Sequence, residues 1–130
     1  MTTILSVRRD DEVAMGGDGQ VKHILDWWHI SMRVQHVEAA VQGLVQIPGF
    51  TGIPVLFQRP AKSLRWWLWH GRARVAETYL KGLMHDCTRL AEEPLAVRTA
   101  AARVRARCET LYTYLANNME SLVDYGRRYR

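Results

Sequence analysis

The last third of the chain carries an apolar stripe that a helix has to bury. Apolar residues recur at a spacing near 3.5 through Val97, Ala101, Val104, Cys108, Leu111, Leu115 and Leu122. This spacing places the side chains on one face of an α-helix, and such a face needs a partner to cover it. Pro94 stands where this helix is expected to begin, because proline is tolerated in a first turn.

The partner helix is expected directly upstream. Its predicted range is about 62–91, with one face formed by Leu64, Leu68, Val75, Tyr79, Leu83 and Cys87. A short turn at 92–94 joins the two, so residues 62–122 are predicted to form an antiparallel helical hairpin. A further helix before residue 45 is indicated by Ile30, Val34, Val37, Val41 and Leu44, and the proline- and glycine-rich residues 46–60 are predicted to be a loop.

Some β structure is predicted near the N-terminus. The runs 3–7 and 12–15 favour a hairpin, and the Gly-Gly-Asp-Gly sequence at 16–19 favours a turn. Residues 23–26 are predicted to be a short buried strand that ends in Asp26. The expected class is therefore α+β, mainly α: a short β-hairpin and one strand, then a helix and a long helical hairpin.

Charge is distributed unevenly along the chain. Residues 1–21 have a net charge of −2, residues 22–61 of +1 and residues 62–130 of +6. A basic C-terminal half suits a polyanionic partner such as DNA, although a solvated helix surface explains it as well. The candidates for phosphate contacts are Arg98, Arg103, Arg105 and Arg107, which fall off the apolar stripe, with Arg127 and Arg128 near the end.

The aromatic run at 66–70 (Trp-Trp-Leu-Trp-His) permits two interpretations. Trp66 is a candidate for stacking on unpaired bases. Alternatively, Trp67 and Leu68 pack inward while Trp66 and Trp69 cover a neighbouring element.

Several classes of protein are not indicated. No apolar run approaches the length of a membrane span, and the first residues lack the pattern of a secretory signal. The two cysteines, Cys87 and Cys108, have no CxxC spacing, so we expect reduced thiols on helix faces. A cytoplasmic protein without membrane contact is predicted.

Three residues are candidates for chemistry. A carboxylate at a strand end, as expected for Asp26, is suited to Mg²⁺, although an ordinary helix N-cap is the alternative. His29 follows three residues later and could reach back over the strand end. Removal of Met1 would expose Thr2, whose amine could activate its own hydroxyl as a nucleophile.

Residues 2–20, TTILSVRRDDEVAMGGDGQ, resemble the mature N-terminus of the proteasome-like ATP-dependent protease subunit HslV. The resemblance implies Thr2 as the nucleophile and Asp18 as the acid that orders it. It covers about a seventh of the chain and stops by Val21. We therefore treat residues 1–21 as a separate, protease-like segment.

Residues 22–130 resemble insertion-sequence transposases with an RNase H-like DDE domain. HILDWWHISMRVQHVEAAVQGL is similar to the stretch around the second catalytic aspartate, and RWWLWHGR and YLANNMESLVDYGRRYR are similar to the helical insertion and its exit. The resemblance implies a partial RNase H-like domain, with Asp26 as second acid and metal ligand and His29 as its neighbour.

In the intact family, three carboxylates bind two Mg²⁺ ions that cleave and transfer DNA strands. Only Asp26 of the three is identified here. The leading expectation is therefore a truncated, inactive transposase fragment that is prone to self-association. The alternatives are a non-catalytic, basic helical DNA-binding module and a threonine-type protease subunit that uses Thr2.

Overall fold

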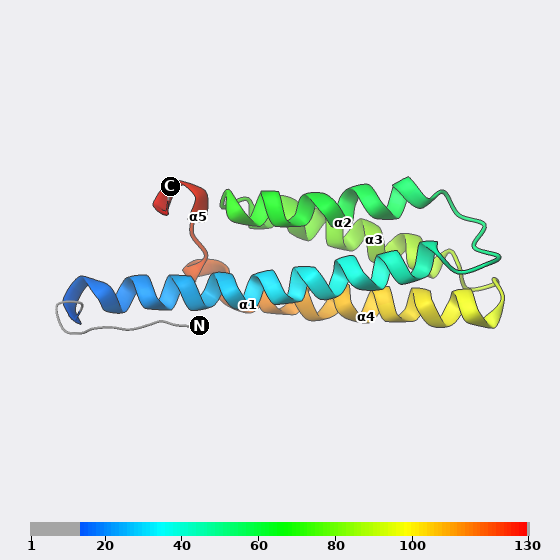
Figure 1. Ribbon diagram of the computed structural model, residues 1–130, viewed down its shortest axis with the longest axis horizontal. Helices are drawn as coiled ribbons and strands as arrows, with labels where there is room; N and C mark the ends of the chain where they lie inside the picture. Colours follow the sequence, from blue (N-terminus) through cyan, green and yellow to red (C-terminus); the bar gives the residue numbers. More distant parts are fainter. Residues whose placement is uncertain (1–13, 130) are drawn as a thin grey trace.

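Four long helices form the body of the protein. The structure, a computed structural model, describes residues 14–129 (Figure 1). Its elements are α1 (Ala14–Val45), α2 (Pro54–Trp69), α3 (Ala73–Thr88), α4 (Leu95–Asn118), the 3₁₀ turn η1 (Met119–Ser121) and the short α5 (Tyr125–Arg128). Successive long helices run in opposite directions and contact each other, and α4 returns to contact α1. The result is an up-down-up-down four-helix bundle.

The expected α+β class is wrong for the described residues, because they contain no strand. Residues 16–19 and 23–26, predicted to be a turn and a strand, both lie within the continuous helix α1. A short apolar run fits either a strand or a helix. A lone strand leaves its backbone N–H and C=O groups unpaired, whereas a helix pairs its own. The predicted hairpin at 3–15 lies outside the described residues except for its last two positions, which are helical.

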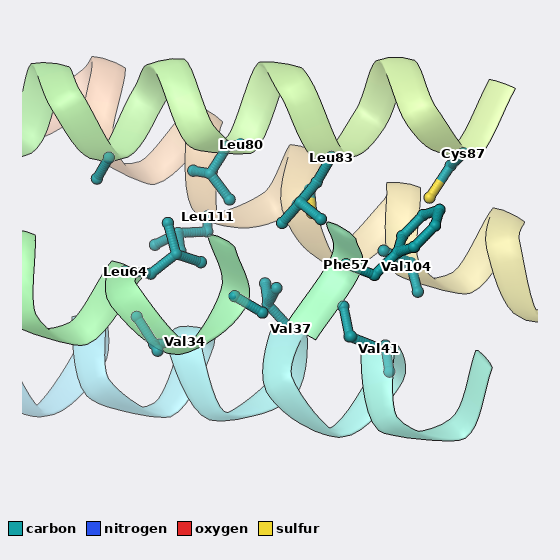
Figure 2. Packing of buried hydrophobic residues seen from close by; sticks show 14 of the residues in the cluster. Val34, Val37, Val41, Phe57, Leu64, Leu80, Leu83, Cys87, Val104 and Leu111 are labelled. Atoms are coloured by element: carbon teal, nitrogen blue, oxygen red, sulfur yellow. The ribbon is translucent and has the colours of Figure 1, made fainter. Parts of the chain in front are cut away.

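The bundle core is built from the predicted faces of α1 and α4. All five periodic apolar residues of α1, from Ile30 to Leu44, are buried. The α4 stripe is buried from Val97 to Leu115, while Leu122 lies beyond α4 and is only partly buried. Figure 2 shows side chains of all four helices meeting, among them Val37, Leu64 and Leu83. The periodicity thus identified these two core faces correctly.

The helix predicted over 62–91 is two helices, α2 and α3, separated at residues 70–72. Gly71 has a φ of 75°, a left-handed conformation that glycine adopts without steric cost. The interruption shifts the helical phase. The buried face of α3 therefore includes Ala76 and Leu80, while Val75 and Tyr79 are only partly buried.

The predicted loop at 46–60 is also too long, because α2 begins at Pro54 and contains Pro60. Pro54 stands in the first turn, where a missing N–H costs little. Pro60 lies in the interior and removes one helical hydrogen bond. Burial of Phe57, Ala61 and Leu64 against the core stabilises the helix in spite of this loss.

Candidate nucleic-acid interface

Helix α4 presents four exposed arginines on the two sides that flank its buried face. Arg98, Arg103, Arg105 and Arg107 are all exposed, as the sequence predicted for residues off the apolar stripe. Residues 95–108 contain these four arginines and no acidic residue. The first part of α4 is therefore positively charged on both sides of its buried face, and we call these four residues the α4 arginine row.

Shallow grooves flank α4 on both sides. The groove between α1 and α4 has a volume of about 330 Å³. It is lined by Arg103, Arg107 and His36 together with small residues. Arg103 and Arg107 are one helical turn apart, so they lie on the same side of α4. The groove between α3 and α4 is lined by Arg98 and Arg105. Each groove thus has a pair of guanidinium groups.

The α4 arginine row has no acidic partner among the described residues. The ion pairs in that part of the chain join Lys22 to Asp26 and Arg65 to Glu38. Arg98 donates from Nε to the Glu93 carbonyl oxygen at 2.9 Å, which fixes the first member of the row. Because no carboxylate of the described residues forms an ion pair with these arginines, their positive charge is available to an anionic ligand.

Asp26 lies inside α1, far from the helix start at Ala14, so it neither ends a strand nor caps the helix. Its Oδ2 accepts a hydrogen bond from Lys22 Nζ at 3.0 Å, and its side chain is 14% exposed. Burial and, next, the Asp26 charge raise the pKa of Tyr125 above its ordinary value. Asp26 is thus a salt-bridged residue beside the aromatic end of the bundle.

His29 does not form a site with Asp26. Its exposed ring contacts Trp28, with ring centroids 5.3 Å apart, and its carbonyl oxygen accepts a hydrogen bond from Arg33 Nη1 at 3.1 Å. In the part of the chain that the structure describes, no three His, Cys, Asp or Glu side chains are placed to hold a metal ion. Two-metal chemistry requires several convergent ligands. The described residues therefore do not fit the Mg²⁺ site that the resemblance implies.

The structure does not test the protease-like pair of Thr2 and Asp18. Thr2 lies outside the described residues. The backbone of Asp18 belongs to α1 rather than to a turn. The use of Thr2 as a nucleophile therefore stays a prediction from the sequence.

The aromatic run at the end of α2 divides between core and surface. Leu68 is buried, Trp67 and Trp69 are partly buried, and Trp66 is 56% exposed. The Trp66 ring contacts Trp67 edge-on at a centroid distance of 5.0 Å and His70 at 4.2 Å. Trp69 contacts Trp27 of α1 and Tyr125 of α5, as one interpretation of the sequence predicted, whereas the ring contacts given above for Trp66 are with residues close to it in the chain.

Residues 122–129, which we call the C-terminal clasp, dock at the end of the bundle where α2 ends (Figure 1). Tyr125 is 1% exposed, and its ring centroid lies 5.2 Å from that of Trp27 and 6.1 Å from that of Trp69. A Cβ atom at Gly126 would lie 2.7 Å from Trp69 Nε1. The absence of a side chain at Gly126 therefore permits this close approach.

The clasp also meets the turn between α2 and α3. A Cβ at Gly71 would lie 3.0 Å from Asp124 Cα. Asp124 Oδ1 accepts a hydrogen bond from the Arg127 backbone N–H at 2.9 Å, which caps α5. Arg127 and Arg128 are exposed on α5. Sequence reasoning missed this docking, and the two glycines were its only local signal.

No protein-family model, curated protein or solved structure matches the chain. Within the described residues, no helix is both long and apolar enough to cross a membrane. The candidate interface therefore rests on two features of the molecule itself, the α4 arginine row and the aromatic end of the bundle.

Proposed function

We propose that this chain is a relative of insertion-sequence transposases that binds DNA without cutting it. The observation that carries the proposal is the α4 arginine row, which is exposed and has no acidic partner among the described residues. The resemblance of residues 22–130 to transposases supports DNA as the polyanion.

The row has the charge and the chemistry needed to contact phosphates on both sides of α4. Arg98 and Arg107 are nine residues apart, a rise of about 13 Å along the helix. Duplex DNA carries one negative charge per about 1.7 Å of its axis, so several phosphates lie within this distance. A guanidinium group donates two parallel hydrogen bonds to phosphate oxygens. Such contacts position a protein on DNA without reading its sequence.

Affinity for duplex DNA should depend steeply on salt. About four phosphate contacts correspond to a slope of about −3.6 in a plot of log affinity against log salt concentration. Affinity should therefore fall about 100-fold between 50 and 200 mM salt. Fluorescence anisotropy with a labelled 20-base-pair duplex of arbitrary sequence measures both quantities.

Paired variants test where the contacts lie. Arg103→Ala with Arg107→Ala should reduce the slope by about 2, because two phosphate contacts are lost. The control is Arg59→Ala with Lys62→Ala on α2, which lies diagonally opposite α4 in the bundle and loses the same charge. An equal loss in the control, or an unchanged slope in the α4 variant, would refute the proposal.

A further inference from the structure

We infer that the end of the bundle formed by Trp66, His70 and the C-terminal clasp is a second DNA-binding surface, specific for unpaired bases. This inference shares with the proposed function only the assumption that the partner is DNA. The residues involved are different, and so is the form of DNA that they bind.

Trp66 is a supported aromatic platform. More than half of its surface is exposed, yet its ring is held between Trp67 at 5.0 Å and His70 at 4.2 Å between centroids. A ring fixed in this way loses little conformational freedom when a ligand stacks on it. The exposed part of the indole leaves apolar surface for a flat partner.

The clasp approaches this platform through His70. Gly126 approaches His70 so closely that a Cβ there would lie 3.3 Å from His70 Nδ1. The next two residues, Arg127 and Arg128, are exposed. The nearby Asp124 carboxylate is already engaged with the Arg127 backbone N–H. The α5 backbone thus meets His70, which contacts Trp66, and the two exposed arginines follow directly in that segment.

This combination suits single-stranded rather than duplex DNA. In a duplex the faces of the bases are covered by their neighbours, whereas an unpaired base exposes both. Single-strand-binding proteins combine aromatic side chains that stack on bases with positive charge that follows the backbone. Stacking tolerates any base, because every base has a π-face. The ligand class is therefore single-stranded DNA without a strong sequence preference.

The test compares two labelled 12-mers with identical phosphates, oligo(dT) and an abasic strand, by fluorescence anisotropy with the full chain. Wild type should bind oligo(dT) about tenfold more tightly, because stacking contributes only where bases are present. Trp66→Ala should abolish this preference. Arg127→Ala with Arg128→Ala should weaken binding of both strands equally, since phosphates are common to them.

Two controls make the result specific. Trp28→Ala removes an indole that is equally exposed, at 55%, but that lies on α1 and contacts His29. This variant should keep the preference for oligo(dT). Arg103→Ala with Arg107→Ala should lower duplex affinity but keep the preference for oligo(dT). Duplex affinity therefore tests the α4 proposal, and the preference for oligo(dT) tests this inference separately. Equal binding of the two strands by wild type, or an equal loss in Trp28→Ala, overturns the inference.

Discussion

Cys87 and Cys108 show how burial controls the chemistry of single residues. Both are free thiols buried between α3 and α4. Desolvation raises the pKa of each to about 12, and the proximity of Cys87 adds to the effect at Cys108. Both thiols therefore keep their protons at neutral pH, and buried thiols of this kind are chemically inert.

The raised thiol pKa values predict a pH dependence of stability. An unfolded cysteine has a pKa of about 8.5, so the folded state binds the proton more tightly. The stabilisation is complete below about pH 8.5 and is lost as the pH rises towards 12. The urea concentration at the midpoint of unfolding should therefore decrease as the pH is raised from about 9 to about 11. In the double variant Cys87→Ala with Cys108→Ala, the midpoint should decrease less over the same pH range. An equal decrease in wild type and variant would show that the two thiols do not cause the pH dependence.

Among the helices, features that depend on regular apolar spacing were predicted correctly, and features that depend on tertiary packing were not. The faces of α1 and α4 were predictable because regular spacing fixes which side chains can be buried together. The break at Gly71 and the start of α2 at Pro54 were not, because both depend on tertiary packing that outweighs local preference. Residues 23–26 were misassigned as a strand because a short apolar run does not distinguish the two structures.

The candidate site was predictable to a similar extent. Exposure of the α4 arginine row follows from its position off the apolar stripe, so the sequence sufficed. The neighbourhood of Trp66 and the clasp joins residues distant in sequence, and no periodic pattern encodes such a contact. The strand that Asp26 was expected to end is not formed, because residues 23–26 lie inside α1.

The docking of α5 against α2 predicts a large effect at Gly126. A Cβ there would lie 2.7 Å from Trp69 Nε1, and Trp69 is held by Trp27 at 4.8 Å between ring centroids. Gly126→Ala should therefore displace the clasp and lower the free energy of unfolding by about 1–3 kcal/mol. Urea unfolding followed by tryptophan fluorescence measures this change, and trypsin should cleave after Arg127 faster than in wild type.

Gly82 offers the matched control for this substitution. It lies exposed within α3, and a Cβ there would meet no atom within 4 Å. Gly82→Ala should raise the free energy of unfolding by about 0.5–1 kcal/mol, because alanine favours the helix. If both variants change stability in the same direction, the close packing of Gly126 is not what sets its effect.

For the whole molecule, the two proposed contacts with DNA lie on different parts of the bundle. The α4 arginine row lies along one helix and offers charge alone, whereas the clasp end combines charge with an exposed indole. The first suits a duplex backbone and the second an unpaired strand. Because they involve different helices, one molecule could hold a junction between duplex and single-stranded DNA.

The whole molecule should nevertheless not cleave the DNA that it binds. Phosphodiester cleavage by two metal ions needs converging carboxylates, and the described residues provide no metal-binding group of three side chains. Asp26 is instead paired with Lys22 at 3.0 Å within α1. The full chain should leave supercoiled plasmid and labelled oligonucleotides intact in buffer that contains Mg²⁺ or Mn²⁺ at millimolar concentration.

Gel assays of wild type beside Asp26→Asn decide this point, because the variant removes the carboxylate while the side chain keeps its size. The two proteins should give the same background of nicked plasmid, with a commercial nuclease as the positive control. Nicking that needs a divalent metal and disappears in Asp26→Asn would show that Asp26 is catalytic. That result would mean that Asp26 leaves its ion pair with Lys22 to bind metal, and the proposal of binding without cleavage would fail.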